Sequence, residues 1–396
     1  MSDHPFYFTW TAQLKALRIE IEKSRDCYYL TTEGRKLYDL SSTSYQAAFG
    51  HSFSPIKKAI QSQLNSLPIS SPKGVFELKQ RATQKLIEYL NIPGKIFYTV
   101  SGAESIENAL KMARQISGKE IILARKNSYH GASLGALSVT GDWRTKDHKS
   151  LSKWTKRIPA PQVDPNAEKL AQLIEKIGAQ KIAAICLETF IGGNGVISAP
   201  LSWWRGLAKL KKKYGFFIIL DEVVCGFGRT GKPFGFHHLP IKPDFICMAK
   251  IITGGYIPFG AVWTSKKIAN YYKSNTLSCG LTNYAHPLGL SAMESVIDSL
   301  KTTQLQEQIK ALSHGLETYK EKFEEIGVVK EVRVIGTLMA IDLKKNISFK
   351  RFIDEDILVA LVGQRIIIAP PFTMRPSILK KLLKRIERLL KEDSHE

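Results

Sequence analysis

The middle of the chain alternates short, continuous apolar runs with longer stretches in which apolar residues recur every three or four positions. A continuous apolar run is typical of a strand buried on both faces, and the longer spacing is typical of a helix that covers it. The runs occupy residues 95–100, 120–125, 182–188, 216–222, 244–250 and 260–265. This alternation predicts an α/β fold with a mostly parallel central sheet covered by helices.

The pattern changes after residue 285, where one long helix is predicted over about residues 287–325. Strand-like stretches and a final helix follow it, which indicates a smaller α+β domain. We therefore predict an N-terminal segment (1–49) that joins the small domain, a large domain (50–285) and a small C-terminal domain (286–396).

The chain of 396 residues carries 57 Lys and Arg against 36 Asp and Glu, a formal net charge of +21. A charge of this size raises the question of nucleic-acid binding. The basic residues are spread in short runs such as Lys211–Lys213, and residues 379–392 have the spacing of an amphipathic helix with a basic face. We therefore interpret the charge as a basic enzyme surface and expect no specific nucleic-acid partner.

The sequence also bears on the compartment. No apolar run approaches the roughly 18 residues that cross a bilayer, and the N-terminal MSDHPFYFTW lacks the pattern of a secretory signal. The five cysteines contain no CxxC pair, so neither a disulfide framework nor a metal site is predicted. These features predict a cytoplasmic protein without a membrane partner.

Candidate chemistry gathers where the predicted strands end, because open parallel sheets bind ligands beyond the carboxyl ends of their strands. Glu188, Asp221 and Lys250 each lie at the end of an apolar run. A buried carboxylate at Asp221 needs a partner, and burial lowers the pKa of a lysine amine and makes it a usable nucleophile. A simple ion pair between Asp221 and Lys250 is the alternative that this pattern leaves open.

Two turns lie on the same side of the predicted sheet. Ser101, Gly102 and Ala103 connect a predicted strand to a helix, where free amides can bind an anion, although an ordinary serine N-cap has the same pattern. Tyr129 and His130 follow the strand at 120–125, where a ring can stack on a planar ligand, and a buried Tyr–His pair is the alternative.

Longer motifs follow in order along nearly the whole chain. The most specific is DEVVCGFGRTGKPFGFHH (221–238), and around it lie ETFIGGNGVI (188–197), PDFICMAKIITGGYIPFGA (243–261) and GLTNYAHPLGLSA (280–292). Together with the SGAES and YHG turns, they resemble the class III aminotransferases of the ω-amino acid type, pyridoxal 5′-phosphate (PLP) enzymes of fold type I. The resemblance makes the large domain the PLP-binding one and disfavours the simple ion pair.

The resemblance also implies roles for individual residues. Lys250 would hold PLP as a Schiff base and then move a proton, and Asp221 would pair with the pyridine nitrogen. Thr282 would reach the cofactor of the partner subunit, which implies a homodimer. The other cofactor contacts would be the phosphate-binding Ser101, Gly102 and Ala103, the ring-stacking Tyr129 and Val223, and the neighbouring His130, Gly131 and Glu188.

The implied reaction is a ping-pong transfer of an amino group from an ω-amino acid or amine donor to a keto acid such as pyruvate. Gly193 and Val224 stand where family members that use 4-aminobutyrate or ornithine carry an acid and a glutamine. Residues 8–13 (FTWTAQ) instead resemble the start of taurine:pyruvate-type members. The matching position of the arginine that holds the substrate carboxylate in many members is Ala360.

We therefore expect that Arg365 or another base replaces that arginine, or that the acceptor is bound differently. Tyr45 and Trp10 are expected to line the substrate pocket. A core position for Tyr45 is the alternative. A second candidate function is 7,8-diaminopelargonate synthase, because residues 331–337 resemble that enzyme, whereas Ala132 and Tyr45 depart from it. A third is a non-catalytic basic interaction protein on the same fold, which the presence of both Lys250 and Asp221 disfavours.

Overall fold

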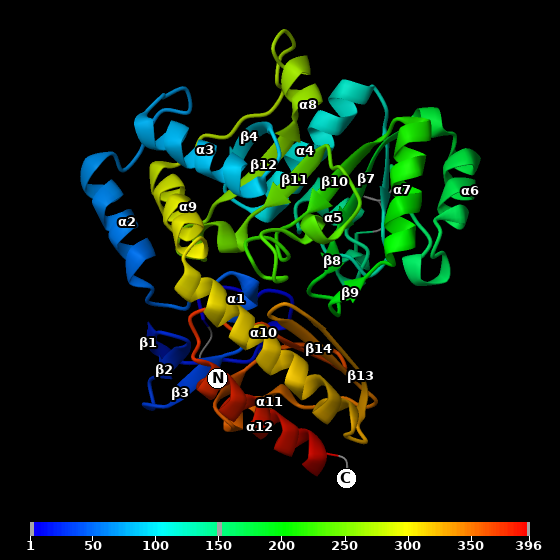
Figure 1. Cartoon of the computed structure of the whole chain (residues 1–396). Coiled ribbons are helices and arrows are strands. Elements are labelled where there is room, and N and C mark those ends of the chain that lie inside the picture. The colour runs from blue at the N-terminus through cyan, green and yellow to red at the C-terminus, as the bar shows by residue number, and fades with distance from the viewer. Residues whose placement is uncertain (1–3, 149–152, 394–396) are drawn as a thin grey trace.

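The computed structural model describes residues 4–148 and 153–393. Its larger layer is a seven-stranded sheet in which only β12 runs against its two neighbours (Figure 1). The strands, in spatial order, are β4 (Gly94–Thr99), β12 (Gly260–Ser265), β11 (Phe245–Met248), β10 (Phe217–Asp221), β7 (Ile182–Glu188), β5 (Ile121–Ala124) and β6 (Thr155–Arg157). The mostly parallel sheet predicted from the apolar runs is confirmed. Strand β6 was not predicted, because three largely polar residues at a sheet edge carry no apolar signal.

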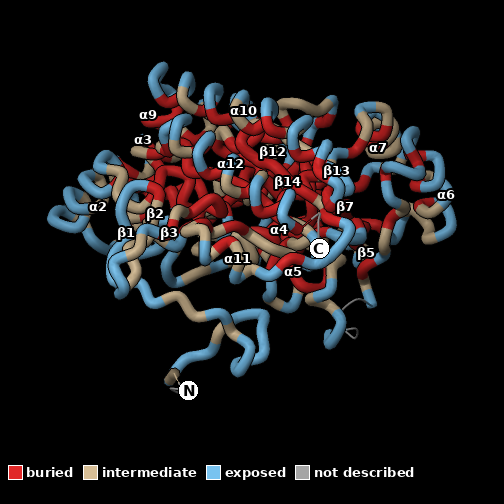
Figure 2. The backbone as a smooth tube through the Cα atoms, turned by 90° about the horizontal axis from the view of Figure 1, so that it is seen from below, coloured by how far each residue is buried: buried red, intermediate tan, exposed pale blue. Residues whose placement is uncertain are grey.

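Both faces of this sheet are buried, because successive side chains of a strand point to opposite faces. Ile218 and Leu220 of β10 pack into one hydrophobic cluster, and Phe217 and Ile219 pack into another. The helices of this layer are α2 (Ser54–Ser66), α3 (Glu77–Leu90), α4 (Gly102–Ser117), α5 (Leu134–Val139), α6 (Glu168–Ile177), α7 (Leu201–Tyr214) and α8 (Lys266–Tyr271). Buried residues accordingly fill the interior, whereas much of the N-terminal stretch is exposed (Figure 2).

The smaller layer contains two four-stranded sheets. The N-terminal strands β1–β3 form one sheet with β15 from the C-terminal half. Strand β15 pairs with β3 in parallel, with Tyr38 opposite Ile357. The N-terminal segment therefore packs with the C-terminal part of the chain, and the division into domains at residues 49 and 285 stays a prediction. The first sheet consists of β1 (Ile21–Arg25), β2 (Tyr28–Thr31), β3 (Lys36–Asp39) and β15 (Ile357–Leu358). The second consists of β13 (Val329–Ile335), β14 (Leu338–Leu343), β17 (Arg365–Ile368) and β16 (Ala360–Val362). Helices α11 (Phe349–Asp354) and α12 (Pro376–Glu392) belong to the same layer.

The single long helix predicted after residue 286 is wrong. The chain forms α9 (Pro287–Leu300) and α10 (Thr303–Glu324), because the backbone of Thr302 is extended and its hydroxyl donates to the Ser299 carbonyl. The break between the helices lets α9 pack on α2 and α3 in the large layer while α10 packs over β13 in the small one (Figure 1).

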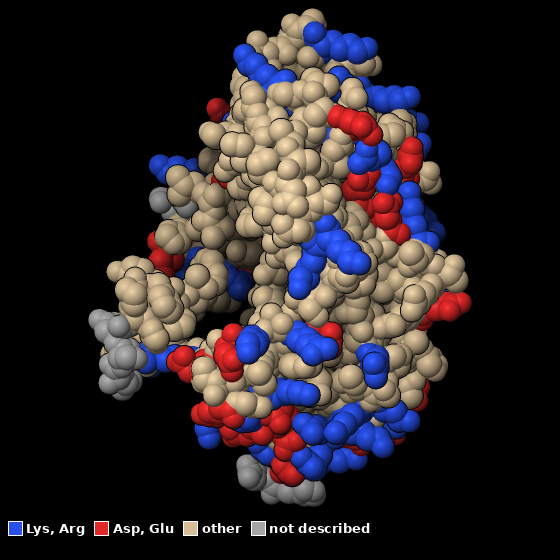
Figure 3. Space-filling model, turned by 90° about the vertical axis from the view of Figure 1, so that its left-hand side faces the viewer, with Lys and Arg blue, Asp and Glu red and all other residues tan. Residues whose placement is uncertain are grey.

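The charges are mixed on the surface. On the face shown in Figure 3, Lys and Arg side chains are interspersed with Asp and Glu. In the described parts of the chain, no helix combines the length and the apolar character needed to cross a membrane.

A strained turn connects the N-terminal sheet to the large layer. Four successive residues, Ser42 to Tyr45, have positive φ angles between 46° and 74°, a left-handed conformation that costs roughly 1–2 kcal/mol per residue. The buried Asp39 carboxylate compensates for this cost, since it accepts hydrogen bonds from the backbone and hydroxyls of Ser41 and Thr43. His51 Nε2 lies 3.2 Å from its Oδ2 atom.

We expect Asp39→Asn to destabilise the protein by about 3 kcal/mol, because an amide cannot replace all these hydrogen bonds. Burial alone would raise the pKa of Asp39, but the hydrogen bonds from His51, Ser41 and Thr43 outweigh it and lower that pKa. The stabilisation is therefore complete above the unfolded-state pKa, near 3.9, and is lost as the pH falls through the lower folded-state value. Thermal unfolding of both proteins should show a constant difference in Tm from about pH 7 to 5 and a narrowing one below about pH 4.

The exposed Asp354→Asn variant is the control, with little expected effect at any pH, because its ion pair with Lys350 lies at the surface. An undiminished difference in Tm between wild type and Asp39→Asn at pH 3 would contradict the assigned role.

Candidate active site

A cavity of about 200 Å³ opens where the parallel strands of the large sheet end. Nine of its lining residues belong to the predicted site, and the two that sequence reasoning missed, Val224 and Ala249, directly follow or precede predicted residues. The lining residues are Gly102, Ala103, Tyr129, His130, Gly131, Glu188, Asp221, Val223, Val224, Ala249 and Lys250. The strand ends therefore bring together side chains up to about 150 positions apart in the sequence.

Asp221 is the last residue of β10, and only 4% of its surface is exposed. Its Oδ2 atom lies 2.8 Å from His130 Nδ1, and its Oδ1 atom accepts the Val223 N–H at 3.0 Å. The second ring nitrogen of His130 is buried and has no hydrogen-bond partner in the described part of the chain. The carboxylate is thus oriented from two sides in a cavity that excludes most water, where it can hold a proton on a ligand nitrogen.

Lys250 follows β11 and begins the 3-10 turn η7 (Lys250–Thr253) with a left-handed φ of 52°. Such a conformation in a non-glycine residue costs roughly 1–3 kcal/mol and persists only where its surroundings enforce it. The amine lies 5.6 Å from the centre of the Tyr45 ring. Part of the Lys250 side chain faces the cavity, but most of it is buried. This burial lowers the pKa of the amine, and the negative charges of Asp221 and Glu188 offset only part of the decrease.

Glu188 ends β7 and lies directly beside Asp221 in the sheet register. Its two carboxylate oxygens accept the N–H groups of Tyr129, at 3.2 Å, and Gly192, at 3.0 Å. Burial chiefly, with a further contribution from the Asp221 charge, raises the pKa of Glu188 to about 7, although these hydrogen bonds and His130 oppose the rise. Glu188 therefore ties two loops to the sheet behind the cavity.

The first turn of α4 approaches the cavity closely. The Ser101 hydroxyl caps the helix by accepting the Glu104 N–H at 3.1 Å, and the amides of Gly102 and Ala103 at the cavity wall precede the first intrahelical hydrogen bond. A Cβ atom on Gly102 would lie 3.0 Å from Val223, and one on Gly131, where φ is 134°, would lie 2.7 Å from Ala103. Only glycines therefore let these turns meet around a space in which a helix N-terminus can bind an anion.

The remaining predicted residues are not among those that line this cavity. Tyr45 is buried and packs with Val196 and Ala340. Its surroundings therefore also fit the alternative that Tyr45 is a core residue and not part of the substrate pocket. Trp10 is half-exposed with its ring edge towards Tyr129, 6.4 Å between the ring centres. Arg365 binds the Asp342 carboxylate and the Asn194 carbonyl and does not line the cavity, and Thr282 is exposed outside it.

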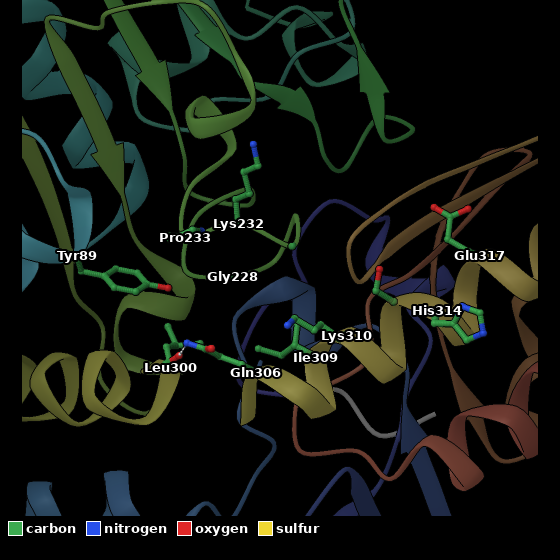
Figure 4. Close-up of a pocket in the computed structure, with 12 residues that line it drawn as sticks. Tyr89, Gly228, Lys232, Pro233, Leu300, Gln306, Ile309, Lys310, His314 and Glu317 are labelled. Carbon is green, nitrogen blue, oxygen red and sulfur yellow. Dashed lines mark hydrogen bonds between the residues drawn. The ribbon is translucent and has the colours of Figure 1, made fainter. Parts of the chain in front are cut away.

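A larger cavity, of about 550 Å³, lies between the loop at 228–233 and α10 (Figure 4). Lys232, Lys310 and His314 are its basic residues, and Tyr89 and Ile309 contribute apolar surface. None of the strand-end residues reaches it. Size alone therefore does not mark the reactive site, and the smaller cavity with its convergent buried charges is the candidate. Within residues 4–148 and 153–393, no three His, Cys, Asp or Glu side chains cluster as they would to hold a metal ion.

Comparison with known proteins identifies the family. A family model described as aminotransferase class-III matches residues 10–390. The chain belongs to the class III aminotransferases. An omega-aminotransferase of Caulobacter vibrioides is 27% identical over 97% of this chain and 96% of its own length. An adenosylmethionine-8-amino-7-oxononanoate aminotransferase of Staphylococcus aureus is 32% identical over 80% of this chain and 75% of its own.

Among solved structures, taurine:2-oxoglutarate aminotransferase from Bifidobacterium kashiwanohense, in complex with PLP and glutamate, superimposes with a TM-score of 0.91 at 28% identity. The alignment covers 98% of this chain and 96% of that one. This class III aminotransferase is accordingly a PLP enzyme of fold type I. The cavity fits PLP, because one amine, one buried carboxylate and one helix N-terminus converge on it.

We expect Asp221→Asn to retain the fold but to lose most of its affinity for PLP and about 100-fold or more of its turnover, since the amide cannot stabilise a proton on a ligand nitrogen. Equilibrium dialysis of PLP against the purified variant measures the first effect, and steady-state transamination measures the second. The exposed Asp298→Asn variant should match wild type in both. Unchanged PLP retention by Asp221→Asn would show that the carboxylate does not hold the cofactor.

Proposed function

We propose that this aminotransferase takes the amino group of an ω-amino acid or amine and delivers it to a keto acid such as pyruvate, in a ping-pong reaction. The observation that carries the proposal is the convergence of the Lys250 amine and the buried Asp221 carboxylate on one cavity at the ends of β10 and β11. Bound PLP supplies an aldehyde carbon that bonds to an amine and a ring that withdraws electrons from it.

Each residue of the cavity has a distinct task in this proposal. The Lys250 amine, with its lowered pKa, binds the cofactor, and its Nζ atom moves the proton at the substrate carbon. Asp221 keeps the ring nitrogen protonated, while His130 and the Val223 amide orient its carboxylate. Tyr129 and Val223 would pack against the cofactor ring, and Ser101, Gly102 and Ala103 would bind its phosphate. Glu188 and Gly131 hold these turns in position.

The relatives support a donor whose amino group is remote from its acid group. The Caulobacter omega-aminotransferase aligns over nearly its whole length, and the aligned Bifidobacterium structure is named for taurine. A second candidate is the 8-amino-7-oxononanoate aminotransferase of the biotin pathway, since the Staphylococcus relative of that name is 32% identical. The two candidates differ in donor, which is a small ω-amino acid in the first and S-adenosylmethionine in the second.

We also propose a homodimer in which Thr282 completes the cofactor site of the partner subunit. Thr282 is exposed and lies outside the cavity of its own chain, as expected of a residue that acts across an interface. The compartment we propose is the cytoplasm, since four of the five cysteines are buried and all five are unpaired.

The visible absorption of the purified holoenzyme tests the function. We expect a cofactor band that bleaches when β-alanine or taurine is added and returns with pyruvate, because each half-reaction changes the cofactor. Lys250→Ala should bind PLP without a bleaching and recovery cycle. Bleaching by S-adenosylmethionine alone would favour the second candidate. A wild-type spectrum that no amine alters would refute the aminotransferase proposal.

Mixed dimers test the role of Thr282. Lys250→Ala and Thr282→Ala subunits, each with little activity alone, are unfolded together and refolded. If Thr282 acts across the interface, half of the dimers contain one complete site, and about a quarter of the wild-type activity returns. If Thr282 acts within its own subunit, no complete site forms and activity stays at the level of the separate variants.

A further inference from the structure

An arginine outside the predicted site lies in an aromatic enclosure near the cavity. Arg144 belongs to the short 3-10 turn η2 (Trp143–Thr145). Its guanidinium carbon lies 4.5 Å from the centre of the Tyr129 ring, 5.2 Å from that of Trp10 and 4.8 Å from that of Trp143. Tyr129 lines the cavity on its other side, so one ring separates Arg144 from the cofactor site.

One edge of this guanidinium has no partner. Nη1 binds the Asp142 carboxylate at 2.5 Å, whereas Nε is buried without a hydrogen bond and Nη2 donates to no described residue. An unpaired buried donor is costly unless a ligand satisfies it. The Nε–Nη2 edge is the fork of two parallel donors that matches a carboxylate or a sulfonate.

Two other arginines near the site are already satisfied. Arg365 binds both oxygens of Asp342, and Arg333 binds Asp342, Glu331 and the Gly195 carbonyl. Arg229 donates to the Pro370 carbonyl and two hydroxyls. Its Nε also lacks a partner in the described part of the chain, but the whole residue is buried and presents no exposed edge to a substrate. Ala360 carries no charge, so none of these positions offers a free cation to a substrate.

Arg144 is held in place by hydrogen bonds, and its charge acts on the Lys250 amine. Asp142 accepts its backbone N–H at 3.0 Å and is itself bound by Asn194 Nδ2 at 3.1 Å, which links the turn to the loop behind the cavity. Burial is the largest cause that lowers the pKa of the Lys250 amine, and the positive charge of Arg144 lowers it further.

We infer that Arg144 is a specificity-determining residue, whose free guanidinium edge binds the carboxylate or sulfonate of the substrate while Lys250 acts on the amine end. The substrates are then amino acids with an acid group remote from the reacting amine, rather than uncharged amines. The rings of Trp10 and Trp143 lie 5.2 Å and 4.8 Å from the guanidinium carbon and help to hold it through cation–π contacts. This inference rests on the proposed function for its substrate and on the geometry of Arg144 for its binding site.

The test compares wild-type holoenzyme with Arg144→Gln, Arg144→Lys and the control Lys146→Gln, which removes an exposed charge two positions away. Calorimetry measures the binding of propionate and of the uncharged, similarly shaped propionamide. In parallel, bleaching of the cofactor band measures the half-reaction with β-alanine and with propylamine, a donor of the same length without the acid group.

We expect Arg144→Gln to weaken propionate binding and raise the KM for β-alanine by about tenfold or more, with propionamide and propylamine changed less than about twofold. Arg144→Lys should recover part of the loss, because it keeps the charge without the fork. Lys146→Gln should behave as wild type.

Two results would overturn the inference: propionate that binds wild type and Arg144→Gln equally weakly, or β-alanine and propylamine that lose activity in parallel. The second result would show that Arg144 only positions Tyr129. If wild type reacts with neither amine, the proposed function fails, whereas the propionate titration still decides whether Arg144 binds an anionic group.

Discussion

The buried carboxylate of Asp221 is the interaction on which the rest of the site depends. A negative charge at the end of a central strand is stable only if other groups compensate it. His130 and the Val223 amide do so on the protein side, and in the proposed function a protonated cofactor nitrogen would complete the set. The neighbouring Glu188, with a raised pKa, uses its oxygens for backbone amides and adds less negative charge to the same region. The parallel sheet thus concentrates charge at one edge and leaves one position for a ligand to fill.

Two strained segments border this edge, and both are held from outside. Lys250 adopts a left-handed backbone conformation at the start of η7, and the turn from Ser42 to Tyr45 does so at four successive residues. Asp39 and His51 stabilise the second from the N-terminal sheet, whose last strand pairs with β15 of the C-terminal half. Strain of this kind persists because surrounding packing pays for it, so the small layer contributes to the shape of a site that lies in the large one.

A chain of polar contacts links the small sheet to the mouth of the cavity. Asp342 in β14 binds Arg365, whose Nη1 donates to the Asn194 carbonyl at 2.8 Å. The Asn194 amide in turn binds Asp142, which holds Arg144. Arg365, the predicted substrate arginine, is thus engaged by Asp342 and Asn194, and the contacts that continue from Asn194 lead to Arg144.

The sheet and the residues at its strand ends could be predicted from the amino-acid sequence, because continuous apolar runs and the acids and lysine that end them are local signals. Asp221, Lys250 and the turns at 101–103 and 129–131 follow from that pattern, and motif order identified the family. The tertiary structure separated α9 from α10 and added the polar edge strand β6. It also showed that Arg365 is engaged by Asp342 and Asn194, whereas Arg144 keeps one edge without a partner among the described residues. Whether an arginine is free depends on partners such as Asp342 and Asp142, which lie 23 positions before Arg365 and two before Arg144. Composition and periodicity do not reveal which partner a charged side chain contacts, because tertiary packing determines which groups lie next to each other.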